Sequence, residues 1–210
     1  GRAVVSLRTL LAGAVVRIGE DVAPSSALRP VDLAELSEEQ RRRLWDAALA
    51  IYFSQLASAD GVFIDLRLEG FRLGSDGALF WRAPAPIWPL EATFRARLVI
   101  LYRAFYSGRD ADFRTGLGEL GLLPARATPE QTDEIHRAFL DHFGTAGDQR
   151  AVRFSLARFN ASFERILEAA SQAGAKVPGE FAVVGLGLLT LYQTLERLGC
   201  DHDVRAIFEA

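Results

Sequence analysis

The segment 61-GVFIDLRLEGFRLGSDGALFW-81 decides the fold prediction for the first half of this chain. In its first part, apolar residues alternate with charged ones, which is the period of a half-buried strand. The Gly-Ser-Asp-Gly run at 74–77 is a turn signal, after which an apolar run can return as the second strand. The segment therefore predicts a hairpin whose solvent side carries Asp65, Arg67 and Glu69.

Helical patterns dominate on both sides of this hairpin. Ser37 and Gln40 have the spacing of a capping box and precede a broad apolar face that runs to about residue 59. Short strands are expected within 3–18, and 82-RAPAPIWP-89 has too many prolines for a helix or a central strand. Further helices are predicted at about 89–106, 110–121, 128–143, 152–174, 179–199 and 202–209.

The composition favours one globular domain. The chain has 210 residues, half of them hydrophobic, and a net charge of −3, which suits a single sizeable core. The predicted class is α+β, mostly α, with small hairpins toward the N-terminus; we divide the domain into 1–36, 37–88 and 89–210. No apolar run is long enough to span a bilayer, although peripheral membrane association stays open.

The composition also limits the function classes. No basic run resembles a nucleic-acid footprint. Cys200 is the only cysteine, which excludes an intrachain disulfide and fits the cytoplasm, the default compartment. The only lysine is Lys176, so any mechanism that clamps phosphates with a lysine would have to use it.

Three short motifs could carry chemistry, and each has a simpler structural explanation. The run 116-GLGELG-121 matches a dinucleotide-binding pattern, but the residues before it look helical, so we interpret it as the end of a helix. Asp133 and His136 could share a metal, although a solvated helix with one half-buried histidine is expected instead. The run 200-CDHD-203 places a thiol beside an imidazole, which is weak support for a dyad.

Taken together, several segments resemble the C-terminal lobe of the UbiB/AarF-type atypical kinases, a protein-kinase-like family associated with isoprenoid quinone biosynthesis. The segment 2-RAVVSLRTLLAG-13 resembles the hinge strand of that family, and 37–63 resembles the helix that leads to its catalytic loop. The segment 90–124 is similar to a helix pair of the family, and 163–208 is similar to its closing helices. The order and spacing of these segments carry the resemblance.

The resemblance implies a catalytic loop of the form His-x-Asp-x-His-Pro-Gly-Asn, followed by an Asp-Gly turn and an Asp-Phe-Gly metal site. Aligning Asp60-Gly61-Val62-Phe63 and Gly70 with that pattern places apolar residues at the catalytic positions. The correspondence is Ile64 at the first His, Leu66 at the Asp, Leu68 at the second His, Phe71 at the Asn, Asp76-Gly77 at the turn, and Ala83-Pro84-Ala85 at the metal site.

A loop with leucine and phenylalanine at these positions lacks the ligands that phosphoryl transfer needs for Mg²⁺. A slip of one residue would bring in Asp65 as the carboxylate, but the Asn position would then fall on Gly70 or Phe71. The downstream metal-binding Asp and the upstream Lys would still be missing. The resemblance therefore implies a degenerate catalytic loop.

The leading hypothesis is a catalytically inactive pseudokinase lobe that binds a partner protein or a hydrophobic small molecule. No cofactor is expected, with Mg-ATP as the exception to test. One alternative is an enzyme whose metal- or nucleotide-dependent site has migrated to Asp65, Glu69 or the Asp133/His136 pair. Another is a subunit completed by a second chain that carries the N-lobe, and the oligomeric state stays open.

Overall fold

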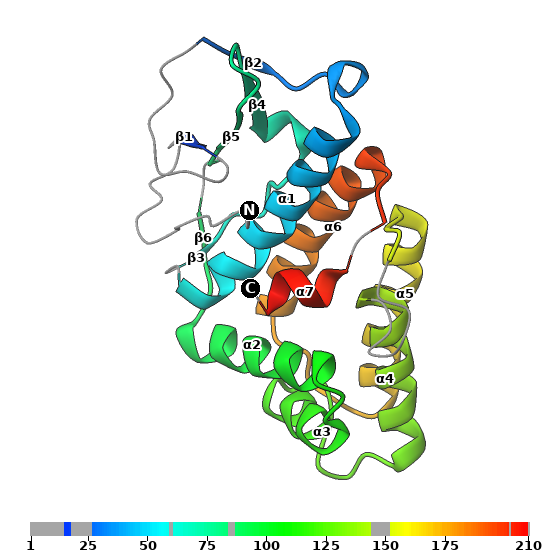
Figure 1. The fold of residues 1–210 in the computed structure, drawn as a ribbon. Helices are drawn as coiled ribbons and strands as arrows, with labels where there is room; N and C mark the ends of the chain where they lie inside the picture. The colour runs from blue at the N-terminus through cyan, green and yellow to red at the C-terminus, as the bar shows by residue number, and fades with distance from the viewer. Residues whose placement is uncertain are drawn as a thin grey trace.

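The protein is a mostly helical α+β structure with small antiparallel sheets near its N-terminal side (Figure 1). The computed structural model describes residues 15–17, 27–58, 61–83, 87–143, 152–201 and 203–209. Most of the segment expected to form short strands at 3–18 lies outside these residues, as does the proposed hinge strand 2–13. Only the strand Val15–Arg17 falls inside them.

Seven α-helices occur in the described part of the chain. They are α1 (Glu38–Ser58), α2 (Ala92–Tyr106), α3 (Asp110–Glu119), α4 (Pro129–Phe143), α5 (Leu156–Gln172), α6 (Glu180–Leu198) and α7 (Val204–Phe208). The strands are β1 (Val15–Arg17), β2 (Leu28–Pro30), β3 (Gly61–Val62), β4 (Phe71–Gly74), β5 (Leu79–Arg82) and β6 (Trp88–Pro89). Two 3₁₀ turns, η1 (Leu33–Glu35) and η2 (Leu68–Gly70), complete the set.

Four strands form an antiparallel sheet in the order β1-β5-β4-β2. Its centre is the β4–β5 hairpin, in which Phe71 lies opposite Trp81 and Leu73 opposite Leu79. The hairpin turn closes with a hydrogen bond from Gly74 N to Ala78 O (2.8 Å). The turn and the second strand predicted from the sequence are therefore confirmed.

A second, two-stranded sheet pairs β3 with β6. Gly61 faces the backbone of Trp88 so closely that a Cβ atom at this position would lie 2.5 Å from the Trp88 carbonyl oxygen. Any larger residue would force the two strands apart, so the glycine permits the pairing. The sequence predicts a helix that begins at Pro89, but α2 begins at Ala92. The pairing of β3 with β6 explains the difference, because Pro89 belongs to β6.

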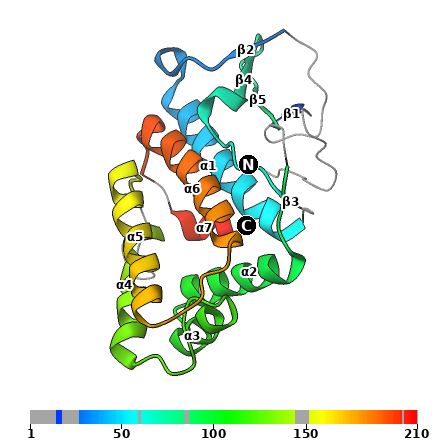
Figure 2. The same ribbon diagram turned by 180° about the vertical axis from the view of Figure 1, so that it is seen from behind.

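Helices α1 and α6 lie side by side at the centre of the molecule in both Figure 1 and Figure 2. Helix α1 also contacts α2 and α7, and it is buried on several faces. Its fully buried side chains include Leu44, Trp45, Ala48, Ile51 and Tyr52. Because such a helix has partners around most of its circumference, its apolar residues do not form one narrow stripe.

The predicted helix ends are confirmed at several positions. Ser37 and Gln40 make both bonds of the capping box, from Gln40 N to Ser37 Oγ (3.1 Å) and from Ser37 N to Gln40 Oε1 (3.0 Å). The α6 helix ends at Gly199, which has a φ of 64°, a conformation that favours glycine. Among the described residues, no helix combines the length and the apolarity required to cross a bilayer.

Candidate functional site

The candidate site is the loop that joins β3 to the β4–β5 hairpin, because the resemblance noted in the sequence predicts a catalytic loop there. The strand predicted over 63–69 is wrong. After β3 the chain has no regular structure until η2 at Leu68–Gly70, and the first strand of the hairpin is β4. Residues 63–67, which we call the connecting loop, satisfy several of their backbone polar groups with side chains from α1 and α6 and not with another strand.

Helix α1 holds the start of the connecting loop through Gln55. Its side-chain oxygen accepts a hydrogen bond from Phe63 N (2.8 Å), and its side-chain nitrogen donates to Phe63 O (3.4 Å). Gln55 is almost completely buried. Because an unpaired buried backbone group is destabilising, this amide fixes the backbone of Phe63 in place of a strand partner.

Helix α6 holds the middle of the connecting loop through two threonines, one turn apart. The Thr190 hydroxyl accepts from Leu66 N (3.0 Å) and lies 2.6 Å from Ile64 O, to which it can donate. The Thr194 hydroxyl donates to Leu66 O (2.8 Å). The backbone of the loop is thus bound to a helix more than 120 residues later in the chain.

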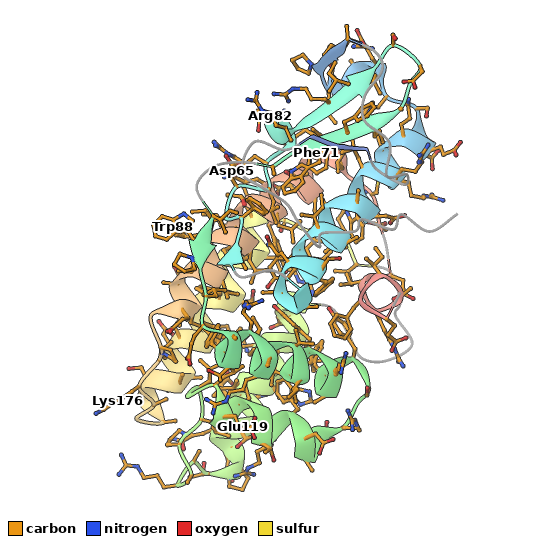
Figure 3. All side chains as sticks on the ribbon, turned by 90° about the vertical axis from the view of Figure 1, so that its left-hand side faces the viewer. Asp65, Phe71, Arg82, Trp88, Glu119 and Lys176 are labelled. Atoms are coloured by element: carbon orange, nitrogen blue, oxygen red, sulfur yellow. The ribbon has the colours of Figure 1, made fainter. Side chains whose placement is uncertain are left out.

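The side chains that the resemblance aligns with catalytic residues contribute to the core. Leu66 and Phe71, which it aligns with the Asp and the Asn, are both 0% exposed, and Leu68 is also buried. Ile64 is partly buried and packs against the same core. Figure 3 shows Phe71 between the hairpin and the helices, with Asp65 nearer the edge of the molecule.

Aromatic packing fills the space behind the connecting loop. The rings of Phe63 and Trp81 meet edge to face, with centroids 5.3 Å apart. Gly70 lies against Trp81, since a Cβ atom there would be 3.3 Å from the Trp81 Nε1. Ala83, which the resemblance aligns with the first residue of the metal motif, is buried, while Pro84 and Ala85 lie outside the described residues. This interior offers no carboxylate or amide oxygen from Leu66, Phe71 or Ala83.

The charged residues of the segment lie on its outer side, as predicted, and they are paired. Arg67 donates to both carboxylate oxygens of Asp65, at 2.8 and 2.7 Å. Arg197 of α6 donates to Glu69 (2.6 Å). The hydrogen bonds from Arg67 lower the pKa of Asp65, and the one from Arg197 lowers the pKa of Glu69. A lowered pKa weakens a carboxylate as a general base at neutral pH.

A shallow hollow of about 230 Å³ borders this outer side, between η2, the start of α5 and the end of α6. Its polar lining includes Arg67, Glu69, Gln193 and Arg197. Each of the two arginines already binds one carboxylate. The hollow is therefore a charge-balanced surface feature.

The remaining sequence candidates lie elsewhere. Asp76 is exposed in the hairpin turn, where its carboxylate accepts from Ala78 N (3.0 Å), a bond that is typical of turns. Lys176 lies near the lower end of the molecule in Figure 3, well away from Asp65 in its upper half. No lysine is therefore available to hold phosphates near the connecting loop.

Asp133 and His136 line a second hollow, of about 280 Å³, between α3 and α4. The imidazole of His136 packs against the ring of Phe113, with centroids 5.0 Å apart, and it is half-buried, as predicted. In the part of the chain that the structure describes, no group of three or more His, Cys, Asp or Glu residues is arranged to hold a metal ion.

The other two motifs have structural roles or lie outside the described residues. The run 116–121 lies in α3 and the turn after it, as predicted, and no strand precedes it. Burial raises the pKa of the Cys200 thiol, whereas a nucleophilic cysteine needs a lowered pKa. His202 lies outside the described residues.

Sequence reasoning missed the residues that hold the connecting loop: Gln55, Thr190 and Thr194. Polar residues within otherwise apolar helices were their only signal, since a buried polar side chain needs a partner. It also missed that all four tyrosines of the chain, Tyr52, Tyr102, Tyr106 and Tyr192, are buried together. A comparison of the chain with models of known families and with curated protein sequences found no match.

Proposed function

We propose that this chain is a catalytically inactive, UbiB/AarF-like pseudokinase lobe that acts by binding a partner protein or a hydrophobic small molecule. The order of elements supports the proposal: a long helix, a two-residue strand, an irregular loop, a hairpin, a second short strand and then helices. This is the order that the resemblance implies around a catalytic loop. A catalytic activity, by contrast, depends on the individual side chains of the site and not on the order of elements.

One observation carries the proposal of inactivity. Leu66 and Phe71 occupy the positions of the catalytic Asp and the metal-binding Asn, and both are fully buried. Phosphoryl transfer depends on positioning and on charge neutralisation by Mg²⁺ and cationic side chains. Buried hydrocarbon at these positions supplies neither a metal ligand nor a proton acceptor.

Isothermal titration of the protein with Mg-ATP, combined with a phosphate-release assay, tests this proposal. We expect no saturable heat and no release above buffer. Micromolar binding with turnover that Asp65→Asn abolishes would overturn it. Asp112→Asn is the matched control, because Asp112 is an exposed carboxylate that pairs with Arg109 and lies remote in sequence from the loop. Turnover that survives both substitutions equally would exclude Asp65 as the catalytic carboxylate.

A migrated active site is the second candidate, and the hollow beside Asp133 and His136 is the observation that favours it. One carboxylate and one imidazole at this spacing could provide two metal ligands. Elemental analysis of purified protein, before and after dialysis against a chelator, tests it. A stoichiometric metal that is lost in His136→Ala would favour this candidate over a binding role.

If the protein acts by binding, it should form a complex with a ligand or a partner protein and should not convert either into a product. A second chain that carries an N-lobe would be one such partner. Size-exclusion chromatography coupled to light scattering, with and without a candidate chain, measures complex formation directly. A protein that remains monomeric with every candidate chain would count against the protein-partner form of the proposal.

A further inference from the structure

The tyrosine cluster (Tyr52, Tyr102, Tyr106 and Tyr192), part of which contacts α7, contains a buried polar group that has no partner among the described residues. The hydroxyls of Tyr52 and Tyr102 are hydrogen-bonded to each other at 2.7 Å. The Tyr106 hydroxyl is buried and has no hydrogen-bond partner among the described residues. Buried hydroxyls are normally hydrogen-bonded, so this one requires an explanation.

Tyr106 lies against α7, since its ring packs on that of Phe208. The Asp203 carboxylate, which caps α7 by accepting from Ala206 N (3.1 Å), is close enough to raise the pKa of Tyr106. Burial is the larger cause of the same shift. The hydroxyl is therefore shielded from water in part by a short C-terminal helix.

Phe208 of α7 occupies an aromatic slot between α1 and α2. Its ring centroid lies 5.0 Å from that of Phe53, 5.3 Å from Tyr106 and 6.1 Å from Tyr102. These are ordinary distances for paired aromatic rings. Phe208 is only partly buried, so one side of the slot is exposed to solvent.

Helix α7 has few means of holding itself in place. It has five residues, too few to be stable as an isolated helix. Val204 is its only buried residue, and Arg153 secures the preceding segment through Gly199 O (2.9 Å) and Asp201 (3.0 Å). Short segments with few buried contacts belong to the parts of a protein that open most readily.

We propose that the slot occupied by Phe208 is a binding site for a flat, apolar, aromatic small molecule that carries a neutral hydrogen-bond acceptor. The ring of the ligand would replace that of Phe208 against Phe53, Tyr102 and Tyr106. Its acceptor would receive the hydrogen bond that the Tyr106 hydroxyl lacks. Helix α7 is then an internal competitor that the ligand displaces. The inference rests on the proposed binding role and gives it a location and a ligand class.

Two fluorescent naphthalene probes test this inference on the full chain. Prodan has a ketone that accepts hydrogen bonds, and N-phenylnaphthylamine has a similar aromatic body without a carbonyl. We expect Phe208→Ala, which empties the slot, to bind prodan one-to-one and about tenfold more tightly than the unmodified protein. Adding Tyr106→Phe should weaken prodan binding by about tenfold, the range expected for one hydrogen bond. It should leave N-phenylnaphthylamine binding unchanged.

Three results would overturn the inference. The first is prodan affinity that Phe208→Ala leaves unchanged. The second is an equal gain from Leu186→Ala, which shortens an exposed leucine of α6 far from the slot in sequence. The third is equal loss of both probes in the Tyr106→Phe background, because the hydroxyl would then not recognise the acceptor.

A second measurement uses the unmodified protein, in case Phe208→Ala does not fold. Prodan should accelerate trypsin cleavage after Arg205, since displacement of α7 exposes that bond. Unchanged cleavage at saturating prodan would contradict the inference. These outcomes are independent of the Mg-ATP experiment: turnover of ATP would overturn the inactive-lobe proposal, while a failure to bind prodan would overturn this site alone.

Discussion

The connecting loop and the tyrosine cluster both bury polar groups, but they differ in how these groups are satisfied. In the loop, the backbone groups of Phe63, Ile64 and Leu66 are bonded to Gln55, Thr190 and Thr194. In the cluster, the Tyr106 hydroxyl has no partner among the described residues. A saturated site gains nothing from a polar ligand, whereas an unsatisfied one does. The connecting loop is therefore closed, and the candidate binding position lies elsewhere.

Alkaline pH should have the largest effect, and it acts on the tyrosine cluster. Burial raises the pKa of all four tyrosines. Their contribution to stability is full below about pH 10, the unfolded pKa, and is lost as the pH rises above it. Each tyrosine that stays protonated in the native state should then lower the free energy of unfolding by about 1.4 kcal/mol per pH unit.

Tyrosinate absorbance during an alkaline titration measures this effect. Few other groups titrate in that range, because the chain has one lysine and one cysteine. We expect the absorbance to rise only with unfolding, and denatured protein to titrate near pH 10. Free titration of the native tyrosines near pH 10 would mean that the cluster is open to water and would remove the contrast with the loop.

Leu66→Asp places a carboxylate at the position that the sequence resemblance aligns with a catalytic Asp, and we expect it to destabilise the protein by about 3–5 kcal/mol, the range for an unpaired buried charge. The reason is that Leu66 is fully buried among apolar side chains. Chemical denaturation measures the loss. Leu186→Asp is the matched control, since the same change at a leucine that is 48% exposed should have a small effect. Equal stability of both variants would show that the loop is not closed.

Removing one hydroxyl from each region compares them directly. Thr190→Val leaves Leu66 N and Ile64 O without a partner and should destabilise the protein by about 1–3 kcal/mol. Tyr106→Phe removes a hydroxyl that has no partner among the described residues and should be neutral or slightly stabilising. Urea denaturation of both variants measures the difference. A destabilising Tyr106→Phe would reveal a partner for the hydroxyl and contradict the ligand inference.

Asp65→Asn should have the smallest effect, below about 1 kcal/mol, because its ion pair with Arg67 is largely exposed. The pKa of Asp65 is lowered, so the contribution of the pair is present above about pH 4 and is lost as the pH falls through the lowered pKa. Denaturation at neutral and acid pH, in a double-mutant cycle with Arg67→Gln, measures it. A loss of several kcal/mol would mean that the outer side of the loop supports its closure.

The sequence predicted the features that depend on neighbouring residues. The capping box at Ser37, the hairpin turn and the C-terminal ends of α5 and α6 all follow from local spacing, and the structure contains them. Each involves groups within a few residues of one another, so their geometry is set by local conformation. The exposed positions of Arg67 and Glu69 and the half-buried position of Asp65 followed in the same way from alternation.

Only the tertiary structure decided the course of residues 63–67 and the gathering of the tyrosines. An alternating pattern specifies which side chains are buried, but the backbone can satisfy its hydrogen bonds in more than one way. Thr190 and Thr194, more than 120 residues away, provide bonds that a strand partner would otherwise provide. Likewise, no local pattern places Phe208 against Tyr106. The sequence by itself therefore determined the elements and their exposed faces, and long-range packing determined which position is closed and which retains an unsatisfied group.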